Sequence, residues 1–561
     1  MVEVLSEQRE REAPSPEEGP EVGPETVQRA DPQLDRGPVR DFYHGQSIFV
    51  TGGTGFVGKL LIEKLLRGCP EISCIYLLVR PKKGKDAHQR VEELFDDPIF
   101  SKLKEEQPKF RHQIVAISGD CSQPDLGMAV KDRATVMERV SIIFHVAATV
   151  RFDEKMNLAV PINIRSLRDA ISLCRQMPEL KSFVYVSTAY ANCPQPLIEE
   201  KFYESPMDAE KLIALIECLD EKLLGSWPNT YTFTKAVAES VVQKEADDLP
   251  IGVFRPAIVI STYREPLQGW IDNMYGPTGV AVGAGTGILR SIHCDEALNV
   301  DIVPADLTIN ALIVCAWDVA NRRSRSGEIE NGDIARKPRN DIPIYNYVSK
   351  DNPITFRMLK NLSEKYGLEF PTIKAIWYYS FRNNKHKAVH AFYVYFLHLL
   401  PALLFDAVTL CLGKQPRMLK IYKKIHKFMD VLNYFTTKEW KFSNDAFNAT
   451  LARLTDKDRE NFPCDIAQIN WDLYFRTYMR GIRVHLLKDP IETLPQARVK
   501  WQRQGSQIEK EIYSLRNGPP FIRLSFRLYW CHQVLKLLLA YVILKVCWAL
   551  LTALLRIFDR L

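Results

Sequence analysis

Residues 47–58 read Ser-Ile-Phe-Val-Thr-Gly-Gly-Thr-Gly-Phe-Val-Gly, and this stretch decides the fold. An apolar run of strand length is followed at once by Gly52, Gly55 and Gly58 at GxxGxxG spacing. Glycines at these positions permit a tight turn, the close approach of a pyrophosphate and close packing of a helix on the strand. The unpaired N–H groups and positive dipole at the start of that helix would face the phosphates. The stretch therefore predicts a nucleotide-binding strand–turn–helix unit.

Five further apolar runs follow, separated by longer amphipathic stretches. Together with residues 47–51, the predicted strands are 75–79, 113–117, 142–146, 183–187 and 251–255. Continuous apolar strands that alternate with helices indicate a parallel sheet buried on both faces. We therefore predict a doubly wound, Rossmann-like α/β fold, in which ligands bind at the carboxyl ends of the strands.

The end of the second predicted strand is basic where an NAD-binding site would carry a carboxylate. Arg80, helped by Lys82 or Lys83, would neutralise a 2′-phosphate, which predicts a preference for NADPH. Asp120, after the third strand, is placed to reach the adenine edge. Ala147, after the fourth strand, is small enough to let the cofactor lie close to the backbone.

Catalytic side chains are predicted at the end of the fifth strand and on a later helix. Ser187 and Thr188 end the strand, and Tyr231 and Lys235 are four residues apart, on one face of a helix. The Lys235 ammonium can lower the pKa of the Tyr231 phenol and hold a nicotinamide ribose, while a hydroxyl at 187 or 188 orients a substrate carbonyl. These residues predict an NADPH-dependent reductase.

Several motifs together resemble the fatty acyl-CoA reductases of the insect-like type, which belong to the extended short-chain dehydrogenase/reductase superfamily. The motifs are TGGTGFVGK (51–59), LLVRPKKG (77–84), FHVAATVRF (144–152), VSTAYANC (186–193), YTFTKAVAE (231–239) and FRPAIV (254–259). The likeness spans residues 45–480, roughly. It implies reduction of a long-chain acyl-CoA, with release of CoA, to an aldehyde and then to a primary fatty alcohol, with one NADPH used in each reduction.

The resemblance also implies roles for individual residues. Tyr231 would donate the proton with Lys235 as its partner, and Thr188 or Ser187 would supply the hydroxyl, with Thr188 favoured because related thioester reductases use the threonine of this pair. Asn163 and Pro256 would line the far side of the cofactor site. The cofactor-binding glycine loop would comprise Gly52, Thr54, Gly55, Phe56, Val57 and Gly58. No metal is expected.

Composition divides the chain into four predicted parts. Residues 1–40 contain six prolines, ten acidic and five basic residues and no aromatic residue, which predicts a disordered tail. A reductase domain is predicted over 41–345, a mainly helical domain over 346–520 and a membrane anchor over 521–561.

The anchor prediction rests on an apolar run of 22 residues, 534–555, long enough at about 33 Å to cross a hydrocarbon core. Lys545 lies in mid-span and weakens the prediction. A second apolar stretch, 391–412, contains Pro401 and Asp406 and is predicted to be a monotopic or substrate-channel segment. The predicted location is the endoplasmic reticulum or peroxisome membrane, with the reductase domain in the cytosol.

The overall composition narrows the remaining alternatives. A net charge of +6 over 561 residues does not favour nucleic-acid binding, and 12 cysteines without a CxxC pair fit a reducing compartment. The alternative functions are a 3β-hydroxysteroid or sugar-nucleotide dehydrogenase, which shares the glycine loop and the Tyr/Lys pair, and a catalytically idle membrane-tethered scaffold. Acyl chain length and oligomeric state do not follow from the sequence.

Overall fold

The computed structural model describes residues 36–215, 221–327, 342–377 and 379–502, together with positions 537, 541 and 545. The predicted tail lies outside the described residues except for its last five positions. The predicted anchor lies outside them except for those three single positions.

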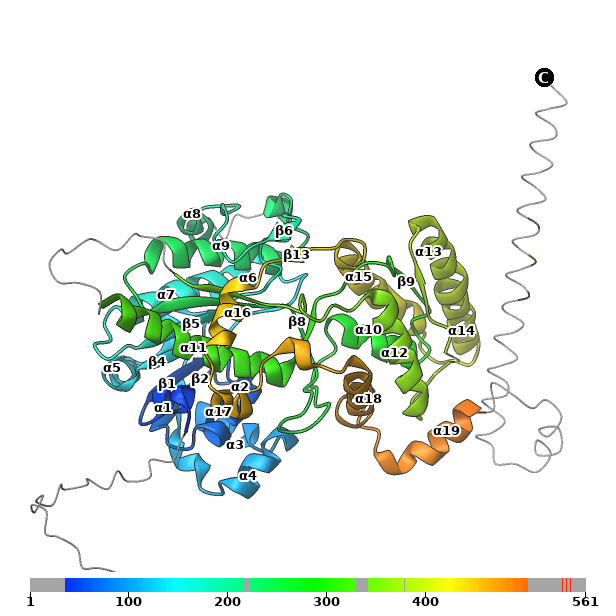
Figure 1. Cartoon of the computed structure of the whole chain (residues 1–561). Coiled ribbons are helices and arrows are strands. Elements are labelled where there is room, and N and C mark those ends of the chain that lie inside the picture. The colour runs from blue at the N-terminus through cyan, green and yellow to red at the C-terminus, as the bar shows by residue number, and fades with distance from the viewer. Residues whose placement is uncertain are drawn as a thin grey trace, which may run out of the picture. The chain divides into compact units, whose positions relative to one another are not determined.

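A seven-stranded parallel sheet forms the centre of the nucleotide-binding half (Figure 1). Its strands are β1 Ser47–Thr51, β2 Cys74–Val79, β3 Ile114–Ser118, β4 Ile142–His145, β5 Ser182–Val186, β7 Ile251–Pro256 and β11 Ile344–Tyr347. Their order in space is β11-β7-β5-β4-β1-β2-β3, so the direction of winding reverses between β1 and β4. The doubly wound fold is thus confirmed, and β11 is a strand that the sequence analysis did not predict.

Alternate side chains of each central strand enter two separate hydrophobic cores, because successive residues of a strand point to opposite faces. In β1, Ile48 and Val50 pack into one core and Phe49 into the other. In β5, Val184 belongs to the first core and Phe183 to the second. Burial on both faces explains why these strands are continuous apolar runs in the sequence.

Helices cover both faces of the sheet. The first face carries α2 Phe56–Gly68 and α11 Ala305–Gly327, and the second carries α5 Val130–Arg139, α7 Ser166–Cys174 and α9 Thr230–Glu245. Shorter helices are α1 Pro38–Tyr43, α3 Ala87–Leu94, α4 Ser101–Glu106, α6 Met156–Val160 and α8 Ala209–Ala214. Both ends of the predicted helix 57–67 lie within one residue of those of α2.

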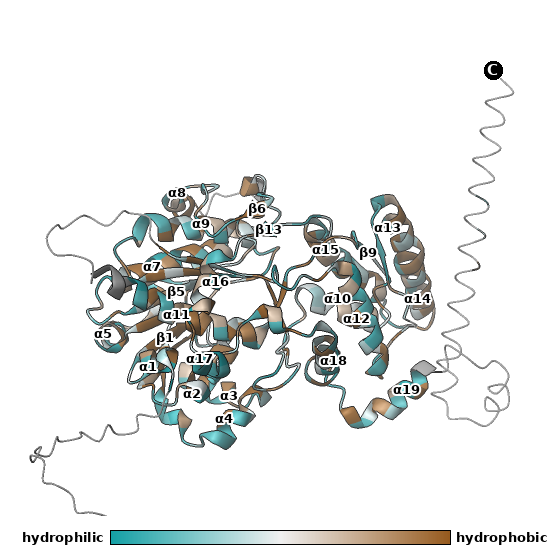
Figure 2. Ribbon diagram, in the orientation of Figure 1, coloured by the Kyte–Doolittle hydropathy of each residue, from teal (hydrophilic) through white to brown (hydrophobic). Residues whose placement is uncertain are grey.

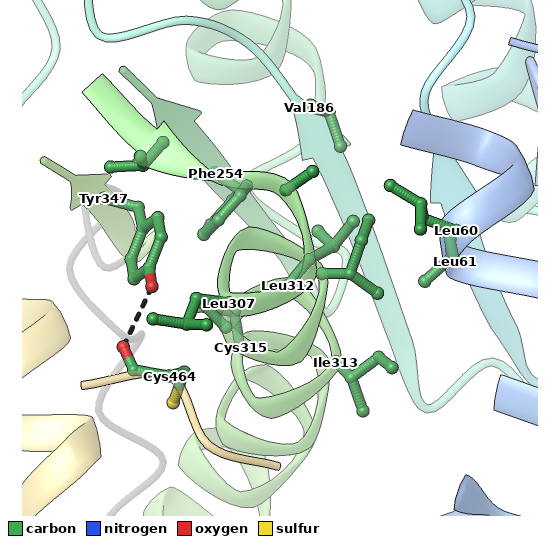
Figure 3. Close-up of a cluster of buried hydrophobic side chains, with 14 of the residues drawn as sticks. Leu60, Leu61, Val186, Phe254, Leu307, Leu312, Ile313, Cys315, Tyr347 and Cys464 are labelled. Atoms are coloured by element: carbon green, nitrogen blue, oxygen red, sulfur yellow. Dashed lines mark hydrogen bonds between the residues drawn. The ribbon is translucent and has the colours of Figure 1, made fainter. Parts of the chain in front are cut away.

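The first core extends beyond the sheet into the carboxyl-terminal third of the described chain. Figure 3 shows side chains of α11 lying between Phe254 and Tyr347 of the sheet on one side and Leu60 and Leu61 of α2 on the other. The Tyr347 hydroxyl donates a hydrogen bond of 2.9 Å to the carbonyl of Cys464. The helices of this returning segment are α16 Asp445–Ala452, α17 Asp456–Asn461 and α18 Trp471–Gly481, followed by α19 Leu494–Gln502.

A second, mainly helical lobe stands beside the carboxyl ends of the strands (Figure 1). It comprises α10 Gly276–Gly285, α12 Phe356–Glu369, α13 Lys387–Tyr393, α14 Leu400–Cys411 and α15 Met418–Thr436. Two small sheets pack against the first core, β8 Ile258–Ile260 with β10 Ile302–Pro304 and β6 Leu197–Ile198 with β13 Lys441–Phe442. A third, β9 Ser291–His293 with β12 Arg382–Asn384, lies in this second lobe. We call the five helices and the β9–β12 sheet the helical lobe.

Candidate active site

A single large cavity, about 1610 Å³ in volume, runs from the carboxyl ends of the central strands into the helical lobe. Fourteen of the fifteen predicted site residues line it, and Asn163 is the exception. The cavity lies at the reversal of strand order between β1 and β4, where open α/β sheets bind their ligands. The fold therefore gathers the sequence motifs in one place.

The glycine loop is shaped to leave room for a ligand at the start of α2. Gly52 has φ +75°, and a Cβ at this position would lie 2.7 Å from the backbone nitrogen of Ala147. A Cβ on Gly58 would lie 2.3 Å from the carbonyl oxygen of Gly52. Gly55 is the N-cap and supplies no side-chain cap, so the first N–H groups of α2 face the cavity unpaired. This cradle fits the pyrophosphate of a dinucleotide.

Basic side chains gather where the cavity passes the end of β2. Arg80, Lys82 and Arg90 all line it, and the Arg80 guanidinium lies 3.8 Å from the Asp120 carboxylate. Arg90 donates a hydrogen bond to the carbonyl of Arg80. Lys83 is not among the lining residues. Sequence reasoning missed Arg90, which lies one turn into α3 and reaches β2 only in the folded chain.

Tyr231 and Thr188 lie together in the lining of the cavity. The Asn229 side chain caps α9 by accepting from the N–H of Thr232 at 2.9 Å, which places Tyr231 in the first turn. Tyr231 shares a side-chain hydrogen bond with Thr188, while burial raises the pKa of the Tyr231 phenol to about 12. The phenol is therefore fully protonated at neutral pH and able to donate.

Lys235 lies one helical turn beyond Tyr231 and is almost completely buried. Its ammonium donates to the carbonyl of Val186 at 2.7 Å and to the hydroxyl of Tyr185 at 3.2 Å. Burial lowers the pKa of Lys235 to about 7, and the charge of Glu239 acts in the opposite direction. The amine is thus bound to β5, one helical turn beyond Tyr231.

The Ser187 hydroxyl has a different hydrogen-bond partner from the Thr188 hydroxyl. Its hydroxyl donates a hydrogen bond of 2.6 Å to Glu239, and Glu239 forms a buried ion pair of 2.7 Å with Arg255. The Arg255 guanidinium also donates to Glu239 at 2.8 Å. The Ser187 hydroxyl is therefore bound within a buried ionic network, whereas the Thr188 hydroxyl faces the phenol.

Asn163 stands behind the cavity wall rather than in it. Its carboxamide accepts from the N–H of Thr149 at 2.9 Å and donates to the carbonyl of Thr149 at 3.2 Å. It also donates to the hydroxyl of Thr234 at 2.9 Å. The sequence analysis predicted Asn163 at the cofactor; in the structure its hydrogen bonds join the loop after β4 to α9.

The far half of the cavity is walled by apolar side chains of the helical lobe, which the sequence analysis did not single out. Phe152 links the two halves, because its ring lies 6.0 Å from that of Tyr231 and is stacked 5.8 Å from that of Phe435. Beyond it the apolar lining residues are Val280, Ile292, Phe356, Leu359, Phe381, Phe428, Val431 and Leu432. We call this half the apolar chamber.

Comparison with known proteins identifies the family of this chain. Models of the male sterility protein family match residues 50–312 and 397–489. The chain is 44% identical over 478 residues to the fatty acyl-CoA reductase wat of Drosophila melanogaster, covering 84% of this chain and 89% of the relative. The chain belongs to the fatty acyl-CoA reductases. Human fatty acyl-CoA reductase 1 is 36% identical over 469 residues, covering 82% of this chain and 88% of that reductase.

Solved structures share the fold of this fatty acyl-CoA reductase at lower sequence identity. The terminal R domain of the myxalamid biosynthetic pathway has a TM-score of 0.52 and 19% identity, covering 79% of this chain and 91% of that domain. The reductase domain of a nonribosomal peptide synthetase from Mycobacterium tuberculosis has a TM-score of 0.51 and 22% identity, covering 81% and 96%. At these identities the likeness shows the fold alone.

Within the described part of this reductase, one helix is long and apolar enough to cross a membrane. It runs from Lys387 to Cys411 through α13 and α14, and 22% of its apolar 18-residue stretch is buried. The stretch overlaps the segment 391–412 that the sequence analysis predicted to be monotopic or part of a substrate channel.

Proposed function

We propose that this chain reduces long-chain fatty acyl-CoA thioesters to primary fatty alcohols with NADPH. The observation that carries the proposal is the position of the Tyr231–Thr188 pair inside one cavity. The glycine loop lies at one end of this cavity and the apolar chamber at the other. Membership of the fatty acyl-CoA reductases supports the same substrate and product classes.

The first reduction needs hydrogen-bond donors for the thioester oxygen. Bound NADPH supplies the hydride. The Tyr231 and Thr188 hydroxyls donate to the carbonyl oxygen and stabilise the negative charge that develops on it. When the carbon–sulfur bond breaks, the electron pair leaves with the CoA sulfur and the carbonyl of an aldehyde forms.

The second reduction needs a proton as well as a donor. Tyr231 delivers its phenolic proton to the aldehyde oxygen, which gives the alcohol. Lys235, one turn further along α9, stabilises the phenolate that remains after this proton transfer. It is also placed to hold a ribose hydroxyl of the cofactor. No acyl-enzyme is required.

The basic edge of the cavity supports NADPH over NADH. Arg80, Lys82 and Arg90 together offer the cationic donors that a 2′-phosphate requires. Asp120, at the same edge, is placed for the adenine, with its carboxylate held by the N–H of Ser122 at 2.8 Å.

The acyl chain is assigned to the apolar chamber, since this half of the cavity offers apolar walls next to Tyr231. We further propose that residues 521–561 anchor the enzyme to the endoplasmic reticulum or peroxisome membrane, with the reductase domain in the cytosol. The apolar composition of 534–555 and of the helix from Lys387 to Cys411 supports a membrane location.

The proposal is tested with the purified full-length chain, palmitoyl-CoA and NADPH. We expect hexadecanol, with two NADPH oxidised for each CoA released. Tyr231→Phe should lower the rate by about 10² to 10⁴, because the proton donor and one oxyanion donor are lost together. Oxidation of a sterol or a sugar nucleotide in place of thioester reduction would instead favour the dehydrogenase alternative. Near-normal turnover by Tyr231→Phe would show that Tyr231 is not the proton donor.

A further inference from the structure

The hairpin formed by α14 and the beginning of α15 exposes large apolar side chains to solvent. Between a third and two thirds of each is exposed. They are Leu403, Leu404, Phe405, Val408, Leu410, Leu412, Leu419 and Ile421. Figure 2 shows this hydrophobic colouring along α13 and α14. A contiguous apolar surface of this kind on a folded domain marks an interaction site. We call it the hairpin face.

The opposite side of the same helix is packed against its own lobe. Leu397, His398, Ala402 and Asp406 are buried. The Asp406 carboxylate accepts three backbone hydrogen bonds of 2.9 to 3.0 Å from the first turn of α15, and so joins the two helices of the hairpin. A helix with one side fixed to protein and the other side apolar and exposed has the pattern of an interfacial helix rather than a span.

Positive charge accompanies the hairpin face. Between Gly413 and Met429 the sequence has six basic and no acidic residues. Four of these basic side chains are exposed and do not line the cavity: Lys414, Arg417, Lys420 and Lys423. Lys424 and Lys427 line the cavity instead, and Lys427 pairs with Asp153 at 3.0 Å. An apolar surface edged by lysines is complementary to anionic lipid headgroups above an acyl layer.

We propose that the hairpin face docks on the surface of a bilayer that contains anionic lipids. Its apolar side chains enter the boundary between headgroups and acyl chains, and Lys420 and Lys423 of α15 lie against the headgroups. Because Phe428, Val431 and Leu432 of the same helix line the apolar chamber, docking brings one wall of the cavity to the membrane. This contact is separate from the anchor assigned to 521–561, and it does not depend on the proposed reaction.

The test measures lipid contact at a single labelled position of the full-length chain. Exposed Cys411 is replaced (Cys411→Ser), and Leu404→Cys is labelled with an environment-sensitive fluorophore. The protein is reconstituted into phosphatidylcholine vesicles with or without phosphatidylserine, and doxyl-labelled lipid serves as the quencher. The matched control is Val130→Cys in α5, another exposed apolar position, and the signal of labelled Cys411→Ser is subtracted.

Lipid docking predicts blue-shifted emission at position 404, quenching by doxyl lipid that increases with phosphatidylserine, and neither effect at position 130. Lys420→Glu with Lys423→Glu should abolish the increase, and neither lysine lines the cavity. Water-like, unquenched emission at 404 in both vesicle types would overturn the proposal. Blue-shifted but unquenched emission would also overturn it, by assigning the face to protein: residues 503–561 of this chain or a second copy. Equal quenching in both vesicle types would refute the requirement for anionic lipid. None of these readings requires enzymatic turnover.

Discussion

Two adjacent hydroxyls, on Ser187 and Thr188, have different environments although the sequence presents them as equivalent. Thr188 meets the Tyr231 phenol, and Ser187 is bound to Glu239 at 2.6 Å. A hydroxyl held by a buried carboxylate is not available to a substrate carbonyl. We therefore propose that Thr188 supplies the catalytic hydroxyl.

Thr188→Val should lower kcat about a hundredfold, because one oxyanion donor is removed while the volume of the side chain is kept. Ser187→Ala is the matched control. It should leave kcat nearly unchanged and cost about 1–3 kcal/mol of stability, because Glu239 loses a buried partner. Initial rates and thermal denaturation separate the two effects. The reverse pattern, with kcat lost only in Ser187→Ala, would transfer the role to Ser187.

Arg80→Asp should raise the KM for NADPH about tenfold, because a cationic contact with the 2′-phosphate becomes a repulsion at a half-exposed site. The KM for NADH should change little. Lys83→Ala is the control, since this lysine belongs to the same basic run but does not line the cavity. Steady-state kinetics with both nucleotides provides the measurement, and a parent enzyme that uses both equally would contradict the assignment.

At the level of elements, the turn between β1 and α2 depends on contacts too close for any side chain. The carbonyl of Gly52 lies where a Cβ of Gly58 would stand, so the last glycine allows the helix to approach the loop. The last residue of α2, Gly68, would place its Cβ 3.4 Å from the Phe462 ring, an ordinary contact distance. In α2, therefore, Gly58 has no room for a side chain, whereas Gly68 does.

Gly58→Ala should weaken NADPH binding about tenfold or more, since relieving the overlap costs about 1–3 kcal/mol and displaces the phosphate cradle. Gly68→Ala should leave the affinity unchanged. Nucleotide titration followed by protein fluorescence distinguishes them. Equal affinities for the two variants would show that the loop tolerates the shift.

Elements also differ in how well the sequence predicts them. The six predicted strands are mainly apolar runs, and all six exist. The seventh, β11, contains Asn346, whose buried carboxamide donates to the carbonyls of Ile198 and Ser443 at 3.2 and 2.8 Å. Its partners come from distant parts of the chain, so no local pattern could mark this strand as buried.

For the whole molecule, the sequence motifs predicted the residues at the nucleotide end of the cavity but not those of the apolar chamber. Phe152, Phe356 and Phe435 reach the chamber from segments far apart in the sequence, and their burial is set by tertiary packing. One predicted site residue, Asn163, is not among the side chains that line the cavity. Residue types at fixed spacing therefore predict chemistry better than they predict the shape of a substrate pocket.

Leu359→Trp should narrow the apolar chamber, because Leu359 of α12 lines it. We expect turnover of palmitoyl-CoA to fall about tenfold relative to octanoyl-CoA, since only the longer chain needs the filled volume. The neighbouring Met358 is exposed and does not line the cavity, so Met358→Trp is the control. A uniform loss with both substrates would place the acyl chain elsewhere.

The continuity of the cavity bears on how long an intermediate stays with the enzyme. The proposed nucleotide and acyl sites occupy different ends of this cavity, so we expect spent cofactor to be exchanged while the half-reduced chain stays bound. We therefore expect the enzyme to be processive, with two molecules of nucleotide oxidised in each encounter with an acyl-CoA. The aldehyde intermediate, which would react with amines elsewhere in the cell, would then have little opportunity to escape.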